Sequence, residues 1–92
     1  MSRLSSFGAS FTWNPSAILD GNEATSTRAI PGAKLGDFAF ASLGVSQEDL
    51  MLNAYVVSDG SVKCQLANNT GGTVDIGLTP LHVVVVPREI ML

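Results

Sequence analysis

The sequence predicts a small all-β domain, and three observations support this prediction. Apolar and polar residues alternate over short stretches, most clearly where Val62, Cys64 and Leu66 alternate with Lys63 and Gln65, as they do in a strand with one buried face. Glycine and proline recur at short intervals and end these stretches. No long segment repeats apolar residues at the helical period. We therefore expect a small antiparallel β-sandwich, jelly-roll-like, or a small barrel.

Length and composition limit the classes of protein to which this chain can belong. The chain has 92 residues, which suffices for one domain. Apolar residues make up 46% and charged residues 14%, which is the balance of a folded chain and not of a disordered one. So few charged side chains suggest that part of the surface is buried against other chains. A formal net charge of -3 argues against nucleic-acid binding, which favours a basic face.

The strands are expected in residues 23–30, 37–43, 51–58, 61–67, 73–76 and 81–86. Phe38 and Phe40 share one face of their strand and are assigned to the core. Asp59-Gly60 lies between two alternating stretches, which predicts a hairpin with a type I′ turn. A single turn is expected at residues 46–50, and Asn68–Gly72 forms a further tight turn because Asn and Gly tolerate left-handed backbone geometry.

The N-terminal segment, residues 1–22, is weakly patterned, and we predict an extended arm that precedes a β-sandwich core of residues 23–92. Pro15 disfavours helix at Asn14, so a turn is expected there. Large aromatic side chains on an arm would be costly to expose on a monomer. We therefore predict that Phe7, Phe11 and Trp13 contact another protein.

The last strand, residues 81–86, is apolar on both faces except at His82. Strands of this kind are usually covered on both sides, and in so thin a domain one covering layer can be a neighbouring subunit. We therefore place His82 and Val84 on the outward face, packed against a sister chain of a homo-oligomer.

Residues that could carry catalysis or bind metal are few. The chain has one cysteine and one histidine, too few for a recognisable zinc site. Cys64 and His82 could in principle form a nucleophile–base pair, but Cys64 fits better as a small buried strand residue. The acidic residues are scattered, mostly in predicted turns, and no phosphate-binding loop is present. We expect a protein that is not an enzyme, with no catalytic residues, no cofactor and no metal.

The sequence was also searched for a signal peptide and for a membrane-spanning segment, and it predicts neither. The N-terminus has no apolar segment of signal-peptide length, and the longest apolar stretch, Val83–Val86, is too short to span a bilayer. We expect no contact with a membrane and synthesis in a cytoplasm.

Three motifs, taken in order, resemble a pattern found in short virion proteins and in fibre or tail-protein termini of tailed bacteriophages. Each contains a turn with glycine or proline, and together they span residues 13–86. They are Trp13-Asn14-Pro15-Ser16-Ala17-Ile18 with Asp20-Gly21, then Ile30-Pro31-Gly32-Ala33-Lys34-Leu35-Gly36-Asp37, then Asn68-Asn69-Thr70-Gly71-Gly72-Thr73-Val74-Asp75.

The resemblance implies a non-enzymatic structural role on a virus particle, in a host bacterial cell. Chains of this size look like capsid decoration, or cement, proteins, which bind the outer shell at the capsid surface and stabilise contacts between subunits of the major capsid protein. Such proteins are commonly trimers. The alternative is a tail-fibre or head-fibre domain that binds a receptor or glycan. No site residue is carried over, because the motifs consist of turn glycines and core positions.

Overall fold

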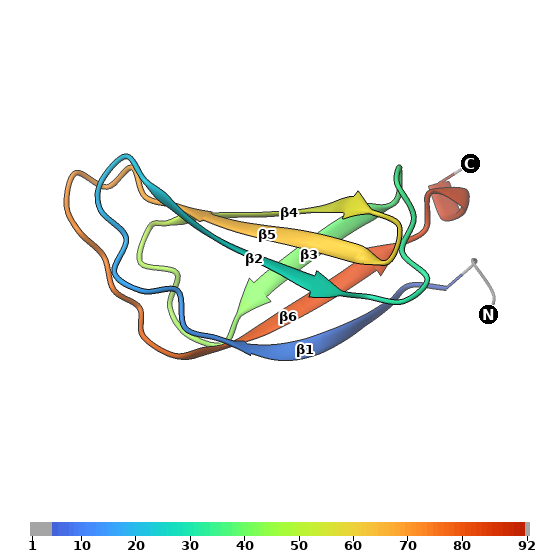
Figure 1. Ribbon diagram of the computed structural model, residues 1–92, viewed down its shortest axis with the longest axis horizontal. Helices are drawn as coiled ribbons and strands as arrows, with labels where there is room; N and C mark the ends of the chain where they lie inside the picture. Colours follow the sequence, from blue (N-terminus) through green and yellow to red (C-terminus); the bar gives the residue numbers. More distant parts are fainter. Residues whose placement is uncertain (1–4, 92) are drawn as a thin grey trace.

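The computed structural model describes residues 5–91 and contains six strands and one short 3₁₀ helix (Figure 1). All four strand pairings are antiparallel. The elements are β1 (Phe7–Trp13), β2 (Glu23–Ala29), β3 (Phe38–Leu43), β4 (Met51–Ser58), β5 (Ser61–Ala67), β6 (Thr79–Val86) and η1 (Arg88–Met91).

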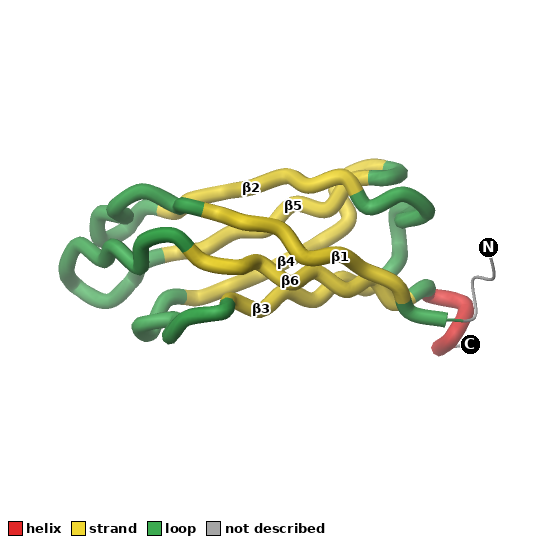
Figure 2. The backbone as a smooth tube through the Cα atoms, turned by 90° about the horizontal axis from the view of Figure 1, so that it is seen from below, coloured by secondary structure: helices red, strands yellow, loops and turns green. Residues whose placement is uncertain are grey.

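The strands form two three-stranded sheets, with the orders β1-β6-β3 and β2-β5-β4. The two sheets pack face to face, and the loops gather at the two ends of the long axis (Figures 1 and 2). Apart from the β4–β5 hairpin, each connection between successive strands passes from one sheet to the other. The expected all-β class and the antiparallel sandwich are confirmed.

The core lies between the sheets and comes from alternate residues of each strand. In β5 the inward residues are Val62, Cys64 and Leu66, all fully buried, as the alternation predicted. In β6 they are Leu81, Val83 and Val85, each at most 1% exposed. Residues between the strands complete the core: Ile18, Ile30, Ala33 and Leu50.

The N-terminal segment differs from the predicted arm. It is extended, but residues 7–13 form strand β1, which pairs with β6 from Phe7↔Val85 to Trp13↔Thr79. Trp13 is 7% exposed and belongs to the core. The boundary at residue 22 therefore does not separate an arm from a core. The strand is hard to recognise in the sequence because Gly8, Ala9 and Ser10 interrupt its large apolar residues.

The prediction that Phe38 and Phe40 belong to the core is wrong. Phe38 is 44% exposed and Phe40 is 60% exposed, whereas Ala39 and Ala41 point inward and pack against the core. The alternation identified which residues share a face, but a period of two does not say which face is buried. The inner space next to β6 accommodates the alanines, so the rings lie outside.

The loop that joins β2 to β3 is closed by Asp37, which is 9% exposed. Its carboxylate accepts from the backbone N–H of Lys34 at 2.9 Å and from that of Arg88 at 3.2 Å. The guanidinium of Arg88 donates to the carbonyl of Leu35 at 3.1 Å. This part of the second resemblance motif therefore fastens η1 to the loop before β3.

Two turns differ in detail from the prediction. The β4–β5 hairpin turns at Asp59-Gly60 as expected, but only Gly60 has a positive φ, of 84°, and the register shifts between Val56 and Ser58. A type I′ turn needs positive φ at both central residues, so the turn type was wrong. The turn within residues 46–50 has positive φ at Glu48 and Asp49.

The prediction of a strand at residues 73–76 is also wrong. That segment makes only one bridge, between Val74 and Ile18. The last strand starts two residues earlier than expected, at Thr79.

Candidate functional site

The structure separates the five predicted contact residues into two groups. Phe7, Phe11 and Trp13 lie on the inward face of β1 and pack against or within the core. Trp13 is buried and is therefore not an exposed anchor for a partner, whereas Phe7 and Phe11 are half-buried and their contact with another protein stays a prediction. His82 and Val84 lie on the outward face of β6, where both are exposed.

The outward face of the β1–β6–β3 sheet carries three exposed large apolar side chains, Phe38, Phe40 and Val84, on the adjacent strands β3 and β6. The register places Val84 between Gly8 of β1 and Phe40 of β3. Phe38 lies at the end of the same face, opposite Val86. Val84 is 41% exposed, beside the two more exposed phenylalanines. We call Phe38, Phe40, His82 and Val84 the outer apolar face.

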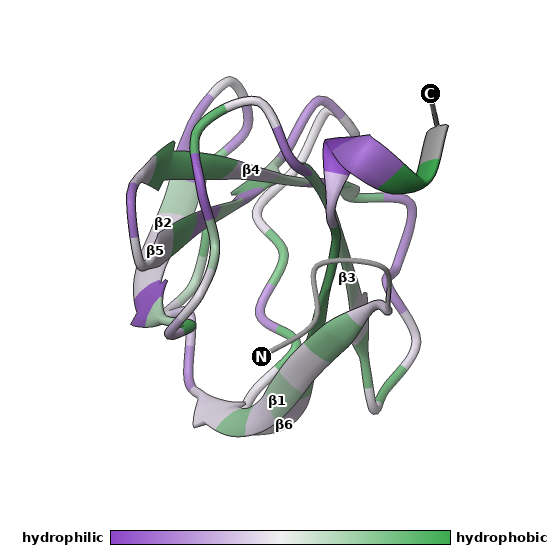
Figure 3. Ribbon diagram, turned by 90° about the vertical axis from the view of Figure 1, so that its right-hand side faces the viewer, coloured by the Kyte–Doolittle hydropathy of each residue, from purple (hydrophilic) through white to green (hydrophobic). Residues whose placement is uncertain are grey.

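This sheet contains no formally charged residue. The sequences of β1, β3 and β6 hold no Asp, Glu, Lys or Arg. The opposite sheet, by contrast, has Glu23 and Arg28 on β2 and Lys63 on β5. Figure 3 looks down the long axis and colours each residue by its hydropathy, so the reader can compare the strands of the two sheets there. An uncharged sheet face with exposed aromatic rings is the kind of surface that proteins bury against a partner.

His82 is the single titratable side chain on the strands of this sheet. Its Nδ1 lies 2.8 Å from the hydroxyl of Ser10, and Ser42 lies opposite it on β3. A serine hydrogen-bonded to a histidine could supply the nucleophile and the base of a catalytic triad. The third member of a triad is a carboxylate that orients the imidazole. The strands on both sides of His82 carry none. Together with Ser42, the pair forms a polar row across the face.

Cys64 and His82 are not brought together. Cys64 is fully buried on the inward face of β5, whereas His82 lies on the outward face of the other sheet. Among residues 5–91 there is no group of three or more His, Cys, Asp or Glu side chains that could hold a metal ion.

Burial makes the Cys64 thiol a poor nucleophile. Desolvation raises the pKa of Cys64 above its ordinary value, and the positive charge of Arg28 offsets this only in part. The reactive form is the thiolate. We expect the native chain to react with a disulfide reagent at pH 8 more than about a hundredfold slower than the urea-unfolded chain, followed by absorbance. Equal rates would place the thiol at the surface.

The same shift gives stability a pH dependence. Because the folded-state pKa is the higher one, the unfolded chain loses the thiol proton first. The contribution of Cys64 to the free energy of unfolding is thus fully present below the ordinary pKa of the thiol, about 8.5. It declines as the pH rises above that value. In Cys64→Ala this part of the decline should disappear, as measured by urea unfolding at a series of pH values.

Arg28 joins the two sheets at their β1–β2 side. It faces inward from β2, lies 5.2 Å from the centroid of the Phe11 ring, and donates to the carbonyl of Thr12 at 2.7 Å. A second bond, from Nε to the hydroxyl of Ser26 at 2.7 Å, fixes the guanidinium. The residue therefore has a structural role across the sandwich.

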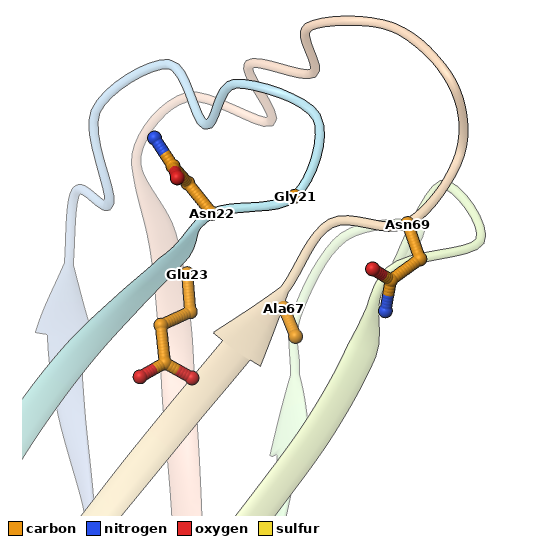
Figure 4. Close-up of a pocket in the computed structure, with 5 residues that line it drawn as sticks. All are labelled: Gly21, Asn22, Glu23, Ala67 and Asn69. Atoms are coloured by element: carbon orange, nitrogen blue, oxygen red, sulfur yellow. The ribbon is translucent and has the colours of Figure 1, made fainter.

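A polar hollow lies at one end of the sandwich, where β2 begins and β5 ends (Figure 4). Its lining residues are Gly21, Asn22, Glu23, Ala67 and Asn69. The side chains of Asn22 and Glu23 point in opposite directions (Figure 4). One carboxylate and two amides can hydrogen-bond a polar molecule, but none of these described lining residues is aromatic, so a stacking platform for a sugar or base is missing.

Comparisons with protein-family models, with curated proteins and with solved structures found no match. No helix among residues 5–91 is long and apolar enough to cross a membrane.

Sequence reasoning found half of the outer apolar face and missed the rest. His82 and Val84 were placed outward, but Phe38 and Phe40 were assigned to the core. A signal was available in the small residues between them: Ala39 and Ala41 suit the inner face of a strand whose neighbour β6 already fills the core with Leu81, Val83 and Val85.

Proposed function

We propose that this chain is a structural virion protein of a tailed bacteriophage, a capsid decoration protein that binds the major capsid protein through its outer apolar face. The observation that carries the proposal is the exposure of Phe38, Phe40 and Val84 together on a sheet without charged residues. The virion setting is supported by the order of the three motifs in the sequence.

The motifs and the face have separate parts in this proposal. Asp37 and Asn68, from the second and third motifs, hold loops by hydrogen bonds, so the motifs maintain the sandwich. The outer apolar face lies on β3 and β6, between those loops, and supplies the contact. Aromatic side chains near the centre of an interface commonly provide much of its binding energy.

The experiment compares two variants on empty shells purified from the phage that encodes the chain. Phe40→Ser should lower the number of copies bound per shell at least about tenfold, since a hot-spot side chain contributes roughly 2 kcal/mol or more. Met51→Ser is the matched control, because Met51 is 64% exposed on the opposite sheet and Phe40 is 60% exposed. Occupancy is measured by densitometry of sedimented shells.

The outcomes separate the proposal from its alternative. Equal occupancy of Phe40→Ser and the wild type would reject the outer apolar face as the contact. Failure of the wild type to bind shells, together with hits on a glycan array, would favour a fibre domain that binds a receptor.

A further inference from the structure

We infer that the sandwich opens locally between β1 and β2 while its β3–β4 side stays closed, and that Arg28 determines how often this opening occurs. We call the facing edges of β1 and β2 the β1–β2 seam. The opening is a property of the folded chain alone and does not depend on the virion role. The approach of the strands, the bonds of Arg28 and the position of Cys64 all support it.

The two sides of the sandwich are closed to different extents. Each sheet has two edge strands, and β3 of one sheet lies alongside β4 of the other. β1 and β2 form the opposite side, and they do not approach each other over a comparable length. Local opening occurs where few contacts hold two elements together. The β1–β2 seam is therefore the weaker side, and its stability depends on what joins the two strands.

Arg28 supplies the hydrogen bond that joins β2 to β1. Its guanidinium donates to the carbonyl of Thr12 at 2.7 Å and lies 5.2 Å from the centroid of the Phe11 ring. Among residues 5–91, no other hydrogen bond connects these two strands. A hydrogen bond from a charged donor is about twice as strong as a neutral one. Loss of the Arg28 side chain should therefore shift the seam toward its open form.

The Arg28 guanidinium is also fixed on its own strand. Its Nε donates to the hydroxyl of Ser26 at 2.7 Å, so the group is held in place before it reaches across to β1. Its partners are a hydroxyl, a carbonyl and an aromatic ring. Within the part of the chain that the structure describes, replacing Arg28 by methionine therefore leaves no carboxylate without a partner, which makes this a clean test of the seam.

Cys64 reports the opening from inside the core. It lies opposite Ser26 in the β2–β5 ladder and is fully buried. Burial raises the pKa of the Cys64 thiol, and the charge of Arg28 offsets part of this rise, which reflects the proximity of the guanidinium. A reagent reaches this thiol only when the chain opens. The rate at which Cys64 is labelled in the folded protein therefore measures the population of open molecules.

Removing Arg28 affects the labelling of Cys64 in opposite directions through charge and through opening. Without the nearby positive charge the thiol is less ionised, and the thiolate is the reactive form, so the loss of charge alone makes labelling slower. A seam that opens more often makes labelling faster. The direction of the change in rate therefore separates the two effects.

The test is the labelling rate of the full chain at pH 8 with dithiodipyridine, an uncharged disulfide reagent, at urea concentrations below the unfolding transition. Arg28→Met should be labelled at least about tenfold faster than the wild type, the change in population expected when a hydrogen bond to a charged group is lost. In both proteins the rate should depend only weakly on urea, because a local opening exposes little new surface.

Two control variants separate the seam from charge and from a general loss of stability. Lys63→Met removes a positive charge next to Cys64, on the outward face of β5, and should change the rate by less than about twofold. Leu52→Ala removes a side chain that packs against the core from β4. It should lower the urea concentration at the unfolding midpoint, yet leave the labelling rate without urea within about threefold of the wild-type rate.

Circular dichroism checks that each variant is folded. If Arg28→Met is unfolded, Arg28→Lys decides, because lysine keeps the charge but lacks the planar fork that bonds Ser26 and Thr12 together. Arg28→Lys should be labelled at least about threefold faster than the wild type.

Three results would overturn the inference. The first is a wild type whose labelling rate shows the full urea dependence of global unfolding at every concentration. The second is a folded Arg28→Met that is labelled no faster than the wild type. The third is an equal acceleration by Arg28→Met and by either Lys63→Met or Leu52→Ala.

Discussion

Replacing Trp13 by alanine is expected to lower the free energy of unfolding by about 3–5 kcal/mol, the usual cost of removing a large aromatic side chain from a core. Trp13 is only 7% exposed and lies at the end of β1, opposite Thr79, where it helps close the sandwich. Small domains have only about 5–15 kcal/mol of stability in total, so the variant should unfold at a much lower urea concentration.

Urea unfolding followed by circular dichroism measures this effect, with Phe40→Ala as the control. Phe40 is 60% exposed, so its removal should change the free energy of unfolding by no more than about 0.5 kcal/mol. The comparison also distinguishes the two interpretations of the N-terminal segment. If Trp13→Ala were as stable as the wild type, residues 7–13 would behave as an arm and the pairing of β1 with β6 would be in doubt.

The second large effect is expected at Asn68, the side chain that organises one end of the sandwich. Asn68 is fully buried. Its amide nitrogen donates to the carbonyls of Ile18 and Gly72, each at 2.7 Å. Its side-chain oxygen accepts from the backbone N–H of Thr70 at 2.9 Å and from the Thr70 hydroxyl at 2.8 Å. The one residue therefore holds the β1–β2 link against the turn that follows β5.

Asn68→Ala should lower the free energy of unfolding by about 2–5 kcal/mol, because each buried group left without a partner costs roughly 1–3 kcal/mol. Asn68→Asp keeps the acceptor for Thr70, loses both donated bonds and buries a carboxylate, so it should be at least as unstable. The control is Asn69→Ala, the same change at the adjacent exposed residue, for which we expect about 0.5 kcal/mol or less.

Thermal and urea unfolding of the three variants provide the measurement. Equal stabilities of Asn68→Ala and Asn69→Ala would show that the hydrogen bonds of Asn68 do not hold the loops together. In that case the third resemblance motif would need an explanation other than loop structure.

The fold class could be predicted because it depends on local signals. The alternation in residues 61–67 requires a strand with one buried face, and it identified Val62, Cys64 and Leu66 as core residues before the partner strands were known. The Asp59-Gly60 turn joined that strand to the preceding one. The turns that contain Gly and Asn ended the strands close to where the structure ends them.

The candidate site could be predicted only in part, because exposure depends on which sheet a strand joins. Val84 was placed outward on the last strand, whereas Phe38 and Phe40 have the hydropathy of core residues and were placed inside. The buried side of β3 instead holds Ala39 and Ala41. Trp13 is the reverse case, since it was expected outside and lies in the core.

The sequence by itself determined that this protein is an all-β chain, with five of its strands predicted at 23–30, 37–43, 51–58, 61–67 and 81–86, each within two residues of the observed bounds, because periodicity and turn residues act over a few positions. Only the tertiary structure decided that residues 7–13 complete a sheet, that β6 lies between β1 and β3, and that the two phenylalanines face outward. The physical reason is that a strand's alternation defines two faces, and the packing of the other sheet against one of them decides which is buried.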